Sequence, residues 1–173
     1  MDLDAARMVW AVDAVIPNSD GPFAGGLNFF FYDDPVTGKF DLLIWDLDNT
    51  FWRLPFDTDP YTWHKEVRFY GRPMYDLTLA DPEQFSAYVA DIDEVLDHAY
   101  EPDRLTARID EWTAQIQEHA FEDPNKPFSN TRYLEAVGDM RQFVRRRHDY
   151  LRAWTGCWKS GGTDDGHGRC VEP

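Results

Sequence analysis

Apolar side chains recur at helical spacing near both ends of the chain. Between residues 3 and 16, Leu3, Met8, Val12 and Val15 fall roughly on one helical face, and a run rich in Pro, Asn, Asp and Gly follows at 17–22. This pattern predicts one amphipathic helix that ends before Pro17. Three further helices with apolar stripes are predicted to start at Asp81, near Asp103 and near Ser129. Asp81 precedes a Pro, which is typical of a capped helix start.

Between the first helix and the others, two strand-like runs extend from Asn28 to Tyr32 and from Lys39 to Asp46. Turn-forming residues at 33–38 separate them, so the pattern predicts an antiparallel β-hairpin. Residues 49–80 contain three prolines and are expected to be irregular. The predicted order is helix, hairpin, irregular segment and helical bundle. We therefore expect an α+β chain that is mostly helical, without alternating βαβ units.

The charge of the chain indicates which kinds of molecule it can bind. The chain has 173 residues, with 32 acidic and 17 basic side chains, and a formal net charge of −15. Such a surface repels nucleic acid and favours cations, so we expect no nucleic-acid partner. No apolar stretch is long enough for membrane insertion, and the acidic N-terminus has no signal-peptide layout.

Both cysteines lie near the C-terminus. Cys157 and Cys170 border a Gly/Asp-rich stretch. We expect a domain over residues 1–156 and a flexible tail over 157–173. The two thiols can form one bridge or stay free, and their spacing leaves both alternatives open.

An apolar strand that ends in two carboxylates is the most informative motif. Side chains alternate along a strand, so Leu42, Ile44 and Asp46 are expected on one face. The two aliphatic side chains would be buried, and Asp46 would emerge at the edge of the core. Asp46 and Asp48 repel each other unless a positive charge lies between them. A hard cation such as Mg²⁺ meets that need.

Folding the hairpin brings a third group to this point. With the turn centred near Val36, Asn28 falls opposite Asp46, to within a residue or two of register. We therefore predict an Mg²⁺ site with Asn28, Asp46 and Asp48 as oxygen ligands. Asp20, in the loop before the first strand, is placed to accept a proton from a hydroxyl. The alternative is that both acidic segments are only turns of the Asx type.

At these residues the sequence resembles the CotH kinase family, which includes spore coat protein H and has an atypical protein-kinase-like fold. The family pattern is an Asp, then Asn-aromatic-aromatic, then an apolar strand that ends in Trp-Asp-x-Asp. Here the pattern is met by Asp20, by Asn28-Phe29-Phe30 and by Trp45-Asp46-Leu47-Asp48. Residues 143–151 are similar to the family's closing helix with its arginine. The resemblance spans about residues 2–155.

The resemblance implies a role for each of these residues. Asp46 would be the metal-binding Asp of a kinase Asp-Phe-Gly motif, and Asn28 the second metal ligand, both beside the ATP cofactor. Asp20 would orient the substrate hydroxyl, and Asp48 would support the metal or its waters. The implied reaction is Mg²⁺-dependent transfer of the ATP γ-phosphoryl group to Ser or Thr of a protein substrate.

The resemblance also implies a kinase C-lobe-like fold with the metal site on the hairpin. A Gly-rich loop followed by a strand Lys is absent from the sequence. We therefore expect the N-lobe to come from a longer version of the same chain, or the isolated chain to be inactive. The typical setting of the family is the spore coat, the cell envelope or the exterior.

Two other classes of function stay open. In a haloacid-dehalogenase-like phosphatase Asp46 would be the nucleophile and Asp48 the acid/base. That fold needs further parallel strands with a Ser or Thr, a Lys and a second acidic pair. Thr78, Lys159 and Asp164-Asp165 are candidates by residue type alone, and residues 81–155 are predicted to be helical without strands between the helices. The third class is a non-catalytic module that binds a cation or a partner at a surface.

The last predicted helix carries a group of arginines. We interpret them as a solvated face that pairs with the abundant acidic residues; a phosphate or partner site is the alternative. The group consists of Arg141, Arg145, Arg146, Arg147 and Arg152.

Overall fold

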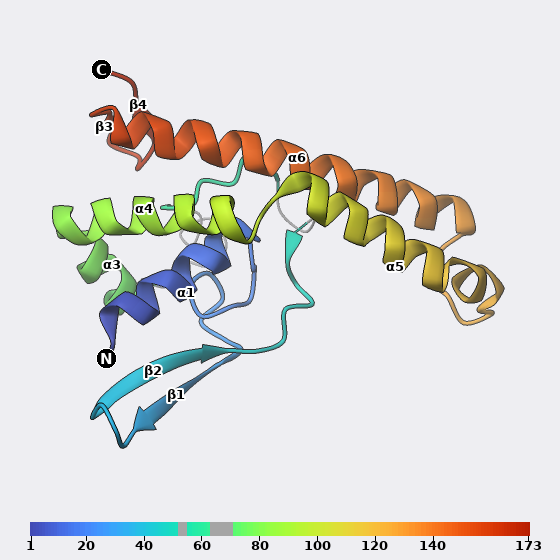
Figure 1. Cartoon of the computed structure of the whole chain (residues 1–173), viewed down its shortest axis with the longest axis horizontal. Helices are drawn as coiled ribbons and strands as arrows, with labels where there is room; N and C mark the ends of the chain where they lie inside the picture. The colour runs from blue at the N-terminus through green and yellow to red at the C-terminus, as the bar shows by residue number, and fades with distance from the viewer. Residues whose placement is uncertain (52–54, 63–70) are drawn as a thin grey trace.

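The computed structural model describes residues 1–51, 55–62 and 71–173. Helices form most of the chain, and the strands form two small antiparallel pairs (Figure 1). The prediction of a mostly helical α+β chain is confirmed. The elements are α1 (Leu3–Val15), β1 (Phe29–Asp34), β2 (Lys39–Ile44), α3 (Pro73–Leu79), α4 (Pro82–His98), α5 (Pro102–Glu122), α6 (Asn130–Lys159), β3 (Thr163–Asp164) and β4 (Cys170–Val171).

The core lies where α4 packs between α1 and α6, and α3 covers one end of it (Figure 1). Its largest fully buried apolar side chains are Trp10, Tyr75, Tyr88 and Phe23. The β1–β2 hairpin lies beside α1; its Leu42 belongs to the core, and Phe29 packs against the core. Asp2 joins the hairpin to α1, because its backbone N–H donates to Phe40 O at 2.9 Å. None of the described helices is long and apolar enough to cross a bilayer.

The predicted helix starts are confirmed by their caps. Side chains of Asp2, Asp81 and Ser129 accept hydrogen bonds from the first turns of α1, α4 and α6. These bonds satisfy backbone N–H groups that have no partner within the helix. The starts could be predicted because such caps use residues that are adjacent in sequence.

One helix was not predicted. α3 lies inside the segment expected to be irregular, and Pro73 occupies its first turn. A proline there is tolerated, since its missing N–H would have no helical partner. Residues 52–54 and 63–70 of the same segment lie outside the described residues.

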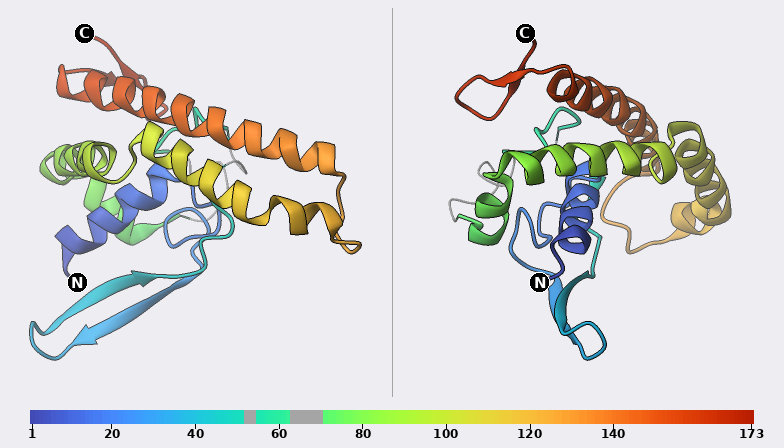
Figure 2. Two further views of the ribbon diagram at one scale, coloured as in Figure 1. Left: turned by 45° about the vertical axis from the view of Figure 1, so that its right-hand side comes forward. Right: turned by 60° about the vertical axis from the view of Figure 1, so that its left-hand side comes forward.

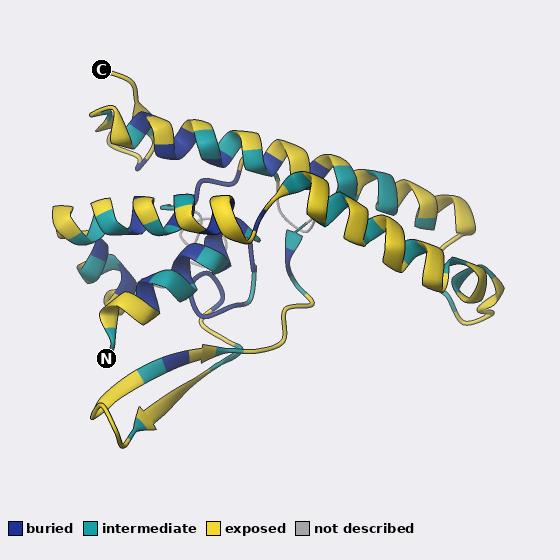
Figure 3. Cartoon of the chain, viewed as in Figure 1, coloured by how far each residue is buried: buried dark blue, intermediate teal, exposed yellow. Residues whose placement is uncertain are grey.

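α5 and the first half of α6 form a helical hairpin that extends away from the core (Figures 1 and 2). α5 has no buried residue, and its exposed surface is plain in Figure 3. Trp112 and Ile116 belong to its predicted apolar stripe but are 57% and 53% exposed. The stripe is therefore packed only in part.

The C-terminal tail is joined to α6. The helix continues to Lys159, and Cys157 forms a disulfide with Cys170 at the start of β4. Gly168 lies so close to the turn at Thr62 that a Cβ at Gly168 would be 1.9 Å from the Thr62 Cγ2 atom. The described tail is thus tied to α6 by a covalent bond and packs against the turn at Thr62.

Candidate functional site

The hairpin places Asn28 at the start of the Trp-Asp-x-Asp segment. Phe29 pairs with Ile44, and the Trp45 N–H donates to the Asn28 backbone oxygen at 3.1 Å. Asn28 is therefore opposite Trp45, one position from Asp46. This agrees with the predicted register within its margin of a residue or two.

The backbone turns sharply at two of the three predicted metal ligands, Asn28 and Asp46. Asn28 has φ 53° and Asp46 has φ 56°, and Phe51 at 58° is the only other non-glycine residue with positive φ in the described ranges. This left-handed region is uncommon for residues other than Gly, although Asn and Asp tolerate it best. Such conformations cluster at functional sites.

The turn at Asp46 corrects one prediction about its side chain. β2 ends at Ile44, so strand alternation does not continue to Asp46. Leu42 is buried as expected, but Ile44 is only half-buried and Asp46 is exposed. Asp46 therefore leaves the hairpin through a change of backbone conformation.

The segment after Asp46 then crosses to the loop that follows α1. The Phe51 N–H donates to Ile16 O at 2.7 Å. Both the N–H and the hydroxyl of Ser19 donate to Asn49 O, at 3.0 and 3.1 Å. These contacts bring the loop that carries Asp20 against the end of the Asp-x-Asp motif.

Asn49 joins the two acidic segments. Its side-chain Nδ2 donates to Asp20 Oδ2 and to Asp48 Oδ1, each at 2.8 Å. The two carboxylate oxygens are consequently within twice that distance of each other. Asn49 was not among the predicted site residues, and its position directly after Asp48 was the only local signal.

A buried carboxylate supports the loop around Asp20. Asp13, in α1, is fully buried and accepts hydrogen bonds from Asn18 Nδ2 at 2.7 Å and from the Phe23 N–H at 3.3 Å. Burial raises the pKa of Asp13 to about 7; its two hydrogen bonds oppose that rise, and the charge of Asp20 adds to it. Asp13 thus fixes both ends of the turn that holds Asp20.

Glycine is required beside Asp20 for steric reasons. A Cβ at Gly25 would lie 2.4 Å from the Asp20 Cα atom and 2.8 Å from its backbone oxygen. No side chain can occupy that space unless the loop moves. The close approach of Gly25 therefore determines where the Asp20 backbone lies.

Arg147 corrects the interpretation of the arginine group as one solvated face. Its side chain is fully buried, and burial lowers its pKa to about 10. It donates to the backbone oxygens of Ala14 and Val15 at the end of α1. It also donates to those of Phe56 and Thr58, in the described segment 55–62. A cation at a helix C-terminus is favoured by the helix dipole. Arg147 consequently fixes the end of α1 from which the Asp20 loop departs.

The other members of the group behave differently from Arg147. Arg141 pairs with Asp110, Arg145 with Asp103, and Arg152 with Asp93. Arg146 is exposed, and its guanidinium lies over the Phe56 ring at 3.7 Å from the centroid. The ion pairs agree with the prediction of arginines that face solvent and pair with acidic residues.

Three buried oxygens near Asp20 have no hydrogen-bond partner: Asn18 Oδ1, Asp20 Oδ1 and Asn49 Oδ1. All three are acceptors, so a cation, a water or a hydroxyl donor would satisfy them. Within the described residues, no three His, Cys, Asp or Glu side chains converge as a metal cluster. The oxygens that could bind a cation here therefore belong to side-chain amides, Asn18 and Asn49, as well as to the carboxylate of Asp20.

The phosphatase alternative finds little support in the architecture. The strands in the described ranges pair only antiparallel. Lys159 pairs with Asp93, and Asp164 accepts hydrogen bonds from the backbone N–H groups of Gly166 and Gly168. These candidate partners of Asp46 are therefore engaged in contacts of their own.

The chain is thus a mostly helical α+β scaffold in which Asn49 joins the Asp-x-Asp segment after the hairpin to the acidic loop that carries Asp20. The family model described as CotH kinase protein matches residues 1–151, and the chain belongs to that family. The match includes all of the site residues and ends in α6, before the disulfide-bridged tail. The search of curated proteins returns no match.

Proposed function

We propose that this protein transfers the γ-phosphoryl group of ATP to Ser or Thr side chains of a protein substrate, with Mg²⁺ as cofactor. Family membership supports a kinase-like function in general. The observation that carries the finer proposal is the contact of Asp20 with the Asp-x-Asp segment through Asn49. A phosphotransfer site needs a hydroxyl-orienting carboxylate next to the groups that hold the metal and nucleotide.

Asp20 is suited to orient the acceptor hydroxyl. Its Oδ2 is held by Asn49 at 2.8 Å, whereas its Oδ1 is buried and has no partner. A Ser or Thr hydroxyl that donates to Oδ1 would direct its oxygen lone pair toward the phosphoryl group. As the bond from the hydroxyl oxygen to the γ-phosphorus forms, the bond from that phosphorus to the β,γ-bridging oxygen would break and ADP would leave, while the hydroxyl proton passes to Asp20.

Asn28 and Asp46 would hold Mg²⁺ and the nucleotide phosphates, and Asp48 would hold the metal or its waters. Bound Mg²⁺·ATP supplies the phosphoryl group and neutralises the charge that develops on it. The donor set fits, because Mg²⁺ takes few protein oxygens and completes its shell with water and phosphate. The left-handed backbone at Asn28 and Asp46 supports the same assignment.

The test measures transfer of labelled phosphate from ATP to dephosphorylated casein and to the chain itself, with and without Mg²⁺. Both the 173-residue chain and the encoded protein with any sequence upstream of Met1 are assayed, since the family resemblance implies an N-lobe from the same longer chain. Asp46→Asn and Asp20→Asn should each lower transfer by about a hundredfold or more. Asp33→Asn is the matched control, because Asp33 is exposed in β1 away from the site.

Absence of transfer and of thermal stabilisation by Mg²⁺·ATP in both proteins would overturn the proposal. Stabilisation without transfer would instead support a non-catalytic binding module. The kinase assignment predicts that the Asp33→Asn variant still forms acid-stable phosphate on casein or on itself. The Asp46→Asn variant should form none.

A further inference from the structure

The amide of Asn49 occupies an unusual position between two carboxylates. Each of its two N–H groups has a carboxylate acceptor, one from Asp20 and one from Asp48. A neutral donor that serves both reduces their mutual repulsion without adding charge. Because Asp20 comes from a separate loop, the amide links the carboxylate of that residue to the carboxylate of Asp48.

The backbone of Asn49 is fixed independently of its side chain. Ser19 donates twice to the Asn49 backbone oxygen, and the Phe51 N–H donates to Ile16 O. These bonds do not involve the Asn49 side chain, so they persist when it is replaced. The side-chain contribution can therefore be measured separately.

The arrangement leaves two buried acceptors of the site without a hydrogen-bond partner. Asp20 Oδ1 and Asn49 Oδ1 are both buried and have no partner. Asn49 thus uses its donor groups on the protein and keeps an acceptor available. A buried acceptor of this kind is satisfied when an O–H donor arrives.

We propose that Asn49 is a positioning residue of the phosphotransfer site. Its amide holds the hydroxyl-orienting Asp20 at a fixed distance from Asp48, and its Oδ1 receives an O–H donor that arrives with the substrate or with hydrated metal. The inference rests on the proposed function for its consequence in catalysis. The positioning itself is a property of the chain and can be tested without activity.

The test compares two replacements with opposite chemistry. Asn49→Asp keeps the shape of the side chain but replaces the donor by a third carboxylate. Asn49→Ala removes the side chain and introduces no charge. If Asn49 only filled space, Asn49→Ala would be the more damaging change. If the amide is a donor between carboxylates, Asn49→Asp should lower both the thermal stability and kcat more than Asn49→Ala does.

The first measurement needs no activity. In NMR spectra of the ¹⁵N-labelled chain, Asn49 should show two side-chain N–H signals shifted by hydrogen bonding. Asp20→Asn and Asp48→Asn should each move these signals, and Asp33→Asn should leave them in place. Signals that do not respond to either change would overturn the positioning role, whatever the activity of the chain.

The second measurement uses kcat and KM for Mg²⁺·ATP in whichever protein transfers phosphate. Asn49→Asp should lower kcat by about tenfold or more, and more than Asn49→Ala does. Equal kcat in Asn49→Asp and the unmodified protein would overturn the catalytic consequence. If no protein transfers phosphate, the proposed function fails, and the NMR and stability results still decide whether Asn49 positions Asp20.

Discussion

The carboxylate of Asp13 accepts a hydrogen bond from the side-chain amide of Asn18 at 2.7 Å, in a fully buried setting. Asn18 lies two residues before Asp20, so this contact ties the candidate hydroxyl-orienting residue to α1. Asp13 has no basic side chain as a hydrogen-bonding or ion-pair partner in the described ranges. Its charged form is consequently costly, and its protonation affects the loop that holds Asp20.

The first prediction concerns pH and unfolding. The pKa of Asp13 rises from an ordinary value of 3.8 to about 7 on folding. Its stabilising contribution is therefore complete below about pH 3.8 and is lost as the pH rises toward 7, by up to about 4 kcal/mol. Asp13→Asn should remove this dependence of stability on pH. The single amide oxygen of the variant replaces two carboxylate oxygens that accept from Asn18 and from the Phe23 N–H. Urea unfolding between pH 4 and 8 measures the difference, and a slope unchanged in the variant would contradict it.

The second prediction concerns the space beside Asp20. Gly25→Ala should displace the Asp20 backbone, destabilise the chain by about 1–3 kcal/mol and lower any phosphotransfer. Gly138→Ala is the matched control, since a Cβ there meets no atom within 4 Å. In a helix that change should stabilise by up to about 1 kcal/mol. Thermal unfolding of both variants checks the prediction, which fails if Gly25→Ala is as stable as the unmodified chain.

Hydrophobic spacing and local capping residues were sufficient to predict the β1–β2 hairpin and the described helices other than α3. Asp81 and Ser129 mark helix starts because their contacts reach only two or three residues along the chain. α3 was missed because Pro73 was interpreted as a breaker, whereas it occupies the first turn. Residues whose partners are close in sequence are thus the ones whose structure could be predicted.

The contacts that build the candidate site join distant parts of the chain. Asn49 contacts Asp20 across 29 positions, and Arg147 contacts Val15 across 132. Neither partner can be predicted from residue spacing. The sequence pattern also does not distinguish a buried arginine such as Arg147 from one that faces solvent. The left-handed turn at Asp46 likewise depends on how the next segment crosses to α1. The motif could be predicted from the sequence, but its assembly could not.

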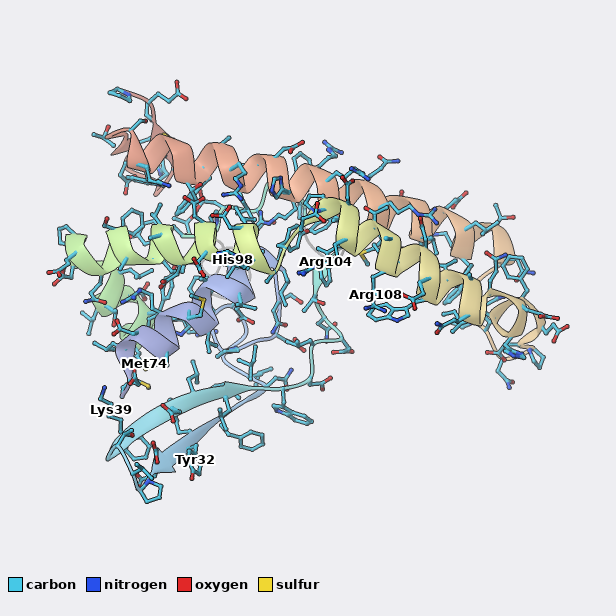
Figure 4. All side chains as sticks on the ribbon, in the orientation of Figure 1. Tyr32, Lys39, Met74, His98, Arg104 and Arg108 are labelled. Carbon is cyan, nitrogen blue, oxygen red and sulfur yellow. A yellow bond between two sulfur atoms is a disulfide. The ribbon has the colours of Figure 1, made fainter. Side chains whose placement is uncertain are left out.

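The third prediction concerns the stability contribution of the exposed face of the hairpin. Tyr32 lies on the side of the hairpin that faces away from the helices, and Lys39 lies toward α1 (Figure 4). Tyr32, Phe30 and Trp45 are each more than half exposed. Phe30→Ser should therefore change stability by less than about 1 kcal/mol. Urea unfolding checks this, and a large loss would show that the face is covered in the folded protein.

The fourth prediction concerns the disulfide. Cys157 and Cys170 are 13 residues apart, and a loop of this size is stabilised by roughly 3 kcal/mol when bridged. Reductant should lower the free energy of unfolding of the chain by about that amount. The Cys157→Ser, Cys170→Ser double variant should already be less stable and should not respond to reductant. An equal response of both proteins would indicate that the bridge is not the cause.

The last prediction concerns the buried cation of α6. Arg147→Met keeps much of the side-chain volume but leaves the carbonyls of Ala14, Val15, Phe56 and Thr58 without their donor. Because buried acceptors without donors are costly, we expect a loss of about 3 kcal/mol or more.

Arg145→Met is the matched control. Arg145 is half-exposed and pairs with Asp103 at 2.9 Å, so its replacement should cost less than about 1 kcal/mol. Urea unfolding gives both values. The Asp20 loop leaves the end of α1 that Arg147 holds, so Arg147→Met should also increase hydrogen exchange at residues 16–20, and Arg145→Met should not. Equal exchange in the two variants would separate Arg147 from the candidate site and leave it a role in stability alone.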